Sequence, residues 1–302
     1  MIETSELVVE RVAGVVGGRI VDNSGLASPE TMAATGFASR RVASEASSLH
    51  SMSLRAARRA LHGLDVSCIS GVVAATFSGE DRFPALSIRL AGELGLSRDI
   101  PTIDLQMACS AYPYALYVAG RISSDTGGKV LVVDGDIQSR LVDPKDGATA
   151  PLFSDASTAS VVSVDSSGTS MFGFMSRTSD ALVCPLSGPI SMDGFKVFSF
   201  VASDVVKFLR RFGSGFDHFV PHRANMYMVR QLAKSLGLED RLMVCPAEYA
   251  NPGSCSVPLA IAAHGHAGRA LVCGFGAGLS AAAGVVRLAE GVSHGVEDDP
   301  GA

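Results

Sequence analysis

Apolar residues in the chain follow two patterns, each typical of a different secondary structure. Four continuous apolar runs are typical of strands that are buried on both faces. These runs are residues 67–76, 129–133, 159–164 and 270–273. Apolar residues spaced by three and four follow Cys109 and again follow His222, and this spacing predicts an amphipathic helix after each. Such strands alternating with helices predict an α/β fold in which helices pack on sheets.

A strand, a polar residue and a helix follow one another twice along the chain. The segment IDLQMACSAY contains Cys109, and HFVPHRANMY contains His222. Two similar halves would bring the ends of these strands together. We therefore expect an N-terminal half at residues 1–164 and a C-terminal half at residues 165–302. Gly, Ser and Pro are frequent at residues 165–195 and predict a long loop-rich excursion, and the polar last residues predict a frayed end.

Composition and charge exclude several classes of protein. The chain has 302 residues, 47% of them hydrophobic, which is enough for a large core. Its net charge of −5 lacks the basic surplus of nucleic-acid-binding proteins. Apolar runs are too short for a transmembrane helix, and the start of the chain is acidic where a secretory signal is basic. We expect a cytoplasmic protein that binds neither nucleic acid nor membrane.

Six scattered cysteines show no spacing typical of metal ligands. We therefore predict no metal site and free thiols. Cys109 lies between a strand and a helix, where the helix dipole favours the nucleophilic thiolate, although a buried thiol is the commoner explanation for a single cysteine. His222 follows Pro221 and could meet an acyl oxygen, or it could be a core or capping residue. Asn251 in YANPGS is first of all a turn signal.

The segment GFGAGLS, residues 274–280, contains three glycines in five residues. Glycine lets a backbone approach a ligand closely, so backbone N–H groups here could face a developing oxyanion. A tight turn between two strands explains the same residues. The segment lacks the Lys-Ser/Thr ending of a phosphate-binding P-loop.

Taken in order, several motifs resemble those of one family. They are DLQMACSAYPYAL, LFSDAS, MDGFKVFSF, VPHRAN, YANPGSCSVPLA and GFGAGLS. This series resembles β-ketoacyl–acyl carrier protein synthase III, a condensing-enzyme branch of the thiolase superfamily, from about residue 35 to about residue 288. The resemblance implies an α/β, thiolase-like, five-layered αβαβα fold made of two similar halves. It also implies a homodimer.

The resemblance assigns roles to the candidate residues. Cys109 would be acylated, and His222 and Asn251 would complete a triad. The backbone N–H groups of Cys109 and Ala277 would form the oxyanion hole. Phe83 would reach the acyl pocket of the partner subunit. The resemblance also implies that Gly276 and Gly278 line the substrate pocket. It implies that Arg223, Arg230 and Lys234 contact the carrier protein.

The chain departs from the family pattern at three places. Family members that use acyl-CoA often hold its adenine between a Trp and an Arg, which would fall near Glu30 and Ala34, and this chain contains no Trp. Residues 154–157 are Ser-Asp-Ala-Ser, where the family usually has Gly-Asp-Gly-Ala. Tyr227 stands where some members have an Arg. We infer a specialised relative in fatty acid or polyketide biosynthesis, of secondary metabolism rather than the housekeeping initiator of fatty-acid synthesis. Its donors would be carrier-bound, or a weakly held CoA.

The resemblance implies an acyltransferase that is a decarboxylative condensing enzyme. A malonyl-type thioester would lose CO₂ and attack the acyl group on Cys109, while His222 and Asn251 stabilise the enolate. One alternative is transfer of the acyl group to an oxygen or nitrogen nucleophile, with His222 as general base. Another is a partner subunit of a heteromeric synthase. The implied substrates are phosphopantetheine thioesters of acyl-CoA or acyl carrier protein, without a further cofactor.

Overall fold

The computed structural model describes residues 1–301 as a mixed α/β chain. The strands are β1 (Ile2–Val16), β2 (Arg19–Asp22), β3 (Ser39–Val42), β4 (Ile69–Ala75), β5 (Thr102–Leu105), β6 (Lys129–Asp136), β7 (Ala156–Ser176), β8 (Leu182–Val183), β9 (Ser191–Met192), β10 (His218–Pro221), β11 (Gly268–Gly276), β12 (Ser280–Leu288) and β13 (Ser293–Asp298). The α-helices are α1 (Pro29–Thr35), α2 (Leu49–Leu61), α3 (Leu86–Glu93), α4 (Ala111–Thr126), α5 (Gly194–Phe200), α6 (Val206–Leu209), α7 (Met226–Leu236) and α8 (Ser256–His264).

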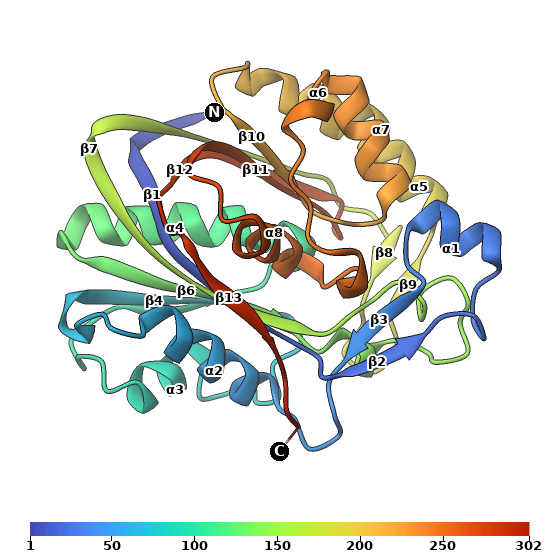
Figure 1. Ribbon diagram of the computed structural model, residues 1–302, viewed down its shortest axis with the longest axis horizontal. Helices are drawn as coiled ribbons and strands as arrows, with labels where there is room; N and C mark the ends of the chain where they lie inside the picture. Colours follow the sequence, from blue (N-terminus) through green and yellow to red (C-terminus); the bar gives the residue numbers. More distant parts are fainter. Residues whose placement is uncertain (302) are drawn as a thin grey trace.

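Helices and strands form five layers, as the sequence predicts (Figure 1). Helices α2 and α3 cover one outer face of strands β4 and β6. Helices α4 and α8 lie in the centre, between these strands and strands β10, β11 and β12 (Figure 1). Helices α5, α6 and α7 cover the other outer face (Figure 1). The central helix α8 is apolar all round, with seven of its nine residues buried, as expected for a helix that is covered on every side.

The main sheet runs in the order β10-β11-β12-β1-β7-β6-β4-β5, with β13 pairing with β1. Strand β7 pairs with different strands along its length, because residues 156–162 pair with β6 and residues 171–176 pair with β12. The boundary that we expect after residue 164 lies inside this strand, where it changes partner. The division into two similar halves stays a prediction.

The apolar runs fall on the strands that they predict. They coincide with β4, β6, β7 and β11, and the amphipathic spacings coincide with α4 and α7. Two other expectations were wrong. Residues 165–176 continue strand β7, so the loop-rich excursion is shorter than expected. The polar end of the chain forms β13, which pairs with β1, and Val292 directly before it is completely buried.

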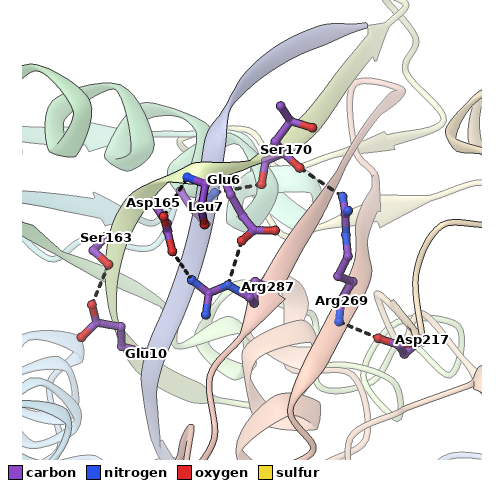
Figure 2. A network of polar contacts seen from close by, with 11 residues as sticks. Glu6, Leu7, Glu10, Ser163, Asp165, Ser170, Asp217, Arg269 and Arg287 are labelled. Carbon is purple, nitrogen blue, oxygen red and sulfur yellow. Dashed lines mark hydrogen bonds and ion pairs between the residues drawn. The ribbon is translucent and has the colours of Figure 1, made fainter.

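Charged side chains connect the strands where β1, β7 and β12 meet (Figure 2). Arg287 of β12 lies 2.8 Å from Glu6 of β1 and 2.8 Å from Asp165 of β7. Ser170 of β7 accepts a hydrogen bond from the Leu7 N–H at 2.9 Å. These contacts hold strands β1, β7 and β12 together. Among residues 1–301, no helix is long and apolar enough to cross a membrane.

Candidate active site

Cys109 lies at the junction that the sequence predicts. Strand β5 ends at Leu105, a short 3-10 helix covers Ala108–Ser110, and α4 begins directly afterwards. Cys109 is buried, with 6% of the residue exposed, and it lines a cavity of about 680 Å³. This volume is typical of a small-molecule site, for which about 300–1,000 Å³ is usual.

Two non-glycine residues of the described chain have positive φ, and both directly precede a predicted catalytic residue. Ala108 has φ 43° and precedes Cys109, while Ala250 has φ 45° and precedes Asn251. Such a conformation is unfavourable for alanine by roughly 1–2 kcal/mol. Backbone strain of this kind persists where the surrounding structure enforces it and is concentrated at functional sites.

The glycine-rich end of β11 packs directly against the cysteine. A Cβ atom on Gly274 would lie 2.5 Å from the Cys109 carbonyl oxygen. A Cβ atom on Gly276 would lie 3.3 Å from the Cys109 Sγ, and Gly276 has φ 155°. Glycine is therefore required at both positions by the closeness of the two backbones. This contact explains the glycines better than a turn alone.

Backbone N–H groups face the cysteine side chain. Hydrogen bonds from the backbone of Ala277 and of Cys109 itself lower the pKa of the thiol. The turn around Ala277 is held by Ser280, whose hydroxyl donates to the Ala277 carbonyl at 2.7 Å and lies 2.6 Å from the Ser110 hydroxyl. These N–H groups are the two that the family resemblance assigns to the oxyanion hole.

His222 is carried by the loop between β10 and α7. Its backbone N–H donates to the Cys273 carbonyl of β11 at 2.7 Å, and its ring packs edge-on against Phe275 with centroids 5.4 Å apart. The Nδ1 atom lies 2.9 Å from the Ser256 hydroxyl. Burial lowers the pKa of His222 to about 4. The imidazole is therefore neutral near pH 7.

Asn251 is 4% exposed and adopts a turn that also fixes its side chain. Its Oδ1 accepts from the Gly253 N–H at 3.0 Å, and its Nδ2 donates to the Ala224 carbonyl at 3.3 Å. Ala224 is two residues after His222, so the asparagine and histidine loops touch. The second hydrogen of Nδ2 is a further donor that a substrate oxygen can use.

Strand β11 thus connects the three predicted catalytic residues. Its Gly274 and Gly276 touch Cys109, its Phe275 touches His222, and His222 is linked to Asn251 through Ala224. Cys109 lines the cavity, whereas His222 and Asn251 are buried and are not among its lining residues.

The resting state of Cys109 differs from the sequence expectation. Burial raises the pKa of its thiol to about 12, and the nearby Asp136 carboxylate acts in the same direction. Burial likewise raises the pKa of Asp136 to about 7. We expected the helix dipole to favour the thiolate, but the effect of burial on the thiol pKa is larger. The thiol is neutral until a proton acceptor is available.

Of the other predicted pocket residues, Gly278 lines the cavity and Phe83 does not. Gly278 lines the cavity with the apolar side chains of Leu141, Leu182 and Ile190. Phe83 is 84% exposed and lies outside the cavity lining of this chain. Its predicted place in the pocket of a partner subunit stays a prediction.

Arg223 was predicted to contact a carrier protein, and this prediction was wrong. The residue is 2% exposed. Its guanidinium donates to the Cys245 carbonyl and lies 5.1 Å from the centre of the Phe37 ring. A docking protein cannot reach it. Arg230 and Lys234, by contrast, lie on the exposed side of α7.

The serine-rich block after residue 153 is accommodated by extra hydrogen bonds. The Ser154 hydroxyl accepts from the Arg41 N–H at 2.8 Å and donates to the Arg41 carbonyl at 2.9 Å. The buried Asp155 accepts from the Ala43 and Ser139 N–H groups, each at 2.8 Å. The hydroxyl that replaces a glycine hydrogen therefore joins this block to β3. Sequence reasoning missed Ser110, Ser256 and Ser280, since no local pattern distinguishes them from other serines.

The fold places the chain among the thiolase-like α/β enzymes. The family model described as 3-oxoacyl-[acyl-carrier-protein (ACP)] synthase III matches residues 103–180, and its C-terminal counterpart matches residues 214–288. These two matches cover half of the chain. The chain therefore belongs to the 3-oxoacyl-[acyl-carrier-protein] synthase III family.

Individual proteins agree with this assignment. A β-ketoacyl-[acyl-carrier-protein] synthase III of Shewanella oneidensis is 31% identical over 284 residues, covering 84% of this chain and 89% of its own. The crystal structure of the priming β-ketosynthase from the R1128 polyketide biosynthetic pathway is 30% identical, with a TM-score of 0.84 over 95% of this chain and 97% of its own. A 3-oxoacyl-(acyl-carrier protein) synthase from Burkholderia xenovorans has a TM-score of 0.91 at 24% identity, over 99% of this chain and 98% of its own, and shows the fold.

Membership of this family defines the class of reaction. The chain is an acyltransferase and a condensing enzyme that uses acyl-thioester substrates.

Proposed function

We propose that Cys109 accepts an acyl group as a thioester and that a decarboxylated malonyl-type thioester then attacks it. The product is a β-ketoacyl thioester. The observation that carries this proposal is that β11 contacts both His222 and Cys109, and that Cys109 lines a cavity of about 680 Å³. These contacts support a site in which a nucleophile, two hydrogen-bond donors and a space for an acyl chain act together.

Each side chain has a role that its surroundings support. The N–H groups of Cys109 and Ala277 would stabilise the oxyanion that forms when the thiol attacks the acyl donor. His222 would take the thiol proton and return it to the thiol that leaves the acyl donor, so that the imidazole is neutral again for the second step. The thiol is neutral in the resting site, and the imidazole is neutral and held at Nδ1 by Ser256. In the second step, His222 and the free Nδ2 hydrogen of Asn251 would stabilise the enolate left by the loss of CO₂.

The decisive experiment follows malonyl-dependent CO₂ release. We expect the purified protein to form an acyl adduct, and then to release CO₂ and β-ketoacyl product when malonyl on a carrier protein is added. Cys109→Ala should form no adduct and no condensation product. Transfer of the acyl group to an amine or alcohol without malonyl would instead show an acyltransferase with His222 as base. Full activity of Cys109→Ala in a complex with another synthase would show a partner subunit.

We propose a carrier-bound thioester as the acyl donor. Helix α1, where the adenine clamp would lie, carries Glu30 and Ala34 and buries none of its residues. Without an aromatic side chain it offers no stacking surface for adenine. On α7, Arg230 and Lys234 are exposed one turn apart and can attract an acidic carrier. An acyl group bound to acyl carrier protein should therefore be transferred to Cys109 faster than the same acyl group bound to CoA. Equal rates would contradict this choice of donor.

We also propose that the protein is a homodimer. Strand β5 is the edge of the main sheet, and Ile103 on it is 38% exposed. Phe83 and Leu186 are 84% and 100% exposed. An open edge beside large exposed apolar side chains is typical of an interface. Leu186 also lines the Cys109 cavity although it is fully exposed, so a second copy that covers Leu186 would add to the wall of this cavity. Phe83→Asp should shift the mass measured by light scattering from dimer to monomer.

A further inference from the structure

We propose that Asp134 is a positioning residue that holds the loop between Asn251 and helix α8 in its reactive place. This inference rests on the proposed function, because it concerns the residues that stabilise the enolate. Asp134 lies near the end of β6 and is 1% exposed. The proposed mechanism does not use this buried carboxyl group, which contacts no substrate in it.

The Asp134 carboxyl group is joined to the catalytic loop by one short hydrogen bond. The Ser254 hydroxyl donates to Asp134 Oδ1 at 2.6 Å, and both residues are buried. Ser254 lies three residues after Asn251 and two residues before Ser256. Ser256 is the residue whose hydroxyl lies 2.9 Å from His222 Nδ1. One carboxyl group from the N-terminal part of the chain therefore reaches the segment that determines where both enolate-stabilising side chains point.

The backbone of Asp134 contacts the same loop. The Cys255 thiol donates to the Asp134 carbonyl at 3.0 Å. At the other end of the loop, the Gln138 Nε2 donates to the Asn251 carbonyl at 3.2 Å, and the Ser154 N–H donates to the same carbonyl at 2.9 Å. The loop is thus held at its start by Gln138 and Ser154 and at its end by Asp134. Removal of the Asp134 side chain leaves the Ser254 hydroxyl without this acceptor in a buried site, which favours a shift of the loop.

The carboxyl group performs this role without a cation. In residues 1–301, no ion pair involves Asp134, and its Oδ2 atom has no hydrogen-bond partner. Burial raises the pKa of Asp134 well above its usual range, and the nearby Asp136 acts in the same direction. An uncharged carboxylic acid still accepts a hydrogen bond at one oxygen. An asparagine, which has a carbonyl oxygen of the same geometry, should therefore replace it.

The test separates acylation from decarboxylation in four proteins: wild type, Asp134→Ala, Ser254→Ala and Asp134→Asn. Acylation of Cys109 is measured by intact mass in single turnover, and malonyl decarboxylation by CO₂ release from the preformed acyl enzyme. We expect Asp134→Ala and Ser254→Ala to slow decarboxylation by about 10²-fold, the scale for a misplacement of roughly 1 Å. Acylation should slow much less than decarboxylation. Among the groups that act in acylation, only His222 depends on this loop, through Ser256, whereas Cys109 and Ala277 lie outside it.

The conservative variant and the double variant complete the test. Asp134→Asn should restore most of the decarboxylation rate, and Asp134→Ala with Ser254→Ala together should be no slower than either alone. Equal losses in both steps, or failure of Asp134→Asn to recover decarboxylation, would overturn the inference. So would wild-type decarboxylation in a folded Ser254→Ala. If wild type itself neither acylates nor releases CO₂, the proposed function fails instead, which distinguishes the two failures.

Discussion

Replacement of Gly274 by alanine probes the contact between β11 and the cysteine. The added Cβ atom would lie 2.5 Å from the Cys109 carbonyl oxygen and 2.7 Å from the Ser110 Cα. Close C···O contacts between backbones are normally about 3.3 Å or longer, so the Cys109 backbone has to retreat by roughly 0.8 Å. Both partners of this clash are backbone atoms, which cannot move aside by changing rotamer.

Two effects should follow from this shift. A displacement of this size moves the thiol away from the Ala277 N–H, and the acylation rate should fall by about 10²-fold. Overpacking of a close contact should also lower the free energy of unfolding by about 1–3 kcal/mol. The acylation rate is measured by intact mass on quenched samples, and stability is measured by denaturant unfolding.

Gly92→Ala is the matched control. Gly92 lies in α3, and a Cβ atom there meets no atom within 4 Å. This variant should acylate at the wild-type rate and gain up to about 1 kcal/mol from better helix propensity. A folded Gly274→Ala protein that acylates as fast as Gly92→Ala would refute the reasoning about this contact.

Three further predictions concern charge. Because burial raises the pKa of Asp136 from 3.8 to about 7, its protonation stabilises the folded state below about pH 4, and this stability is lost as pH rises toward 7. The unfolding free energy of wild type should therefore fall relative to Asp136→Asn between pH 4 and pH 7, and parallel curves would contradict this sign. The double variant Arg230→Glu with Lys234→Glu should raise the KM for a carrier-bound donor several-fold and leave the kinetics with acyl-CoA unchanged. The control Arg121→Glu, on α4, should change neither. An unchanged KM for the carrier-bound donor in the double variant would show that α7 is not part of the docking surface. Arg223→Met should lower the melting temperature without changing the carrier KM, and a raised carrier KM in a stable protein would contradict the burial of Arg223.

Elements with strong local patterns could be predicted from the sequence. The run at residues 129–133 marks the start of β6, and spacings of three and four mark α4 and α7. Strand β1 was missed, because Glu6 and Glu10 interrupt its apolar residues. Those charges are paired in the fold, Glu6 with Arg287 and Glu10 with Lys129. A strand that depends on distant partners leaves no clear local pattern.

The candidate site shows the same limit. The order of the cysteine, histidine and asparagine motifs indicated the family, and the structure brings the loops that carry them together. The pKa of Cys109 could not be predicted, because it depends on burial by residues far away in the sequence. The burial of Arg223 depends on Phe37 and Cys245, which lie on separate loops. Likewise, the bond between Asp134 and Ser254 spans 120 residues.

The central claim is that Cys109 carries the acyl group. Its most direct test is intact-mass analysis after incubation with a panel of acyl-CoA and acyl-carrier thioesters, followed by peptide mapping. The account predicts one adduct with the mass of the donor's acyl group, located on Cys109 and absent from Cys109→Ala. An adduct that persists in Cys109→Ala, or no adduct from any donor when the Cys109 thiol is shown to be free, would contradict it.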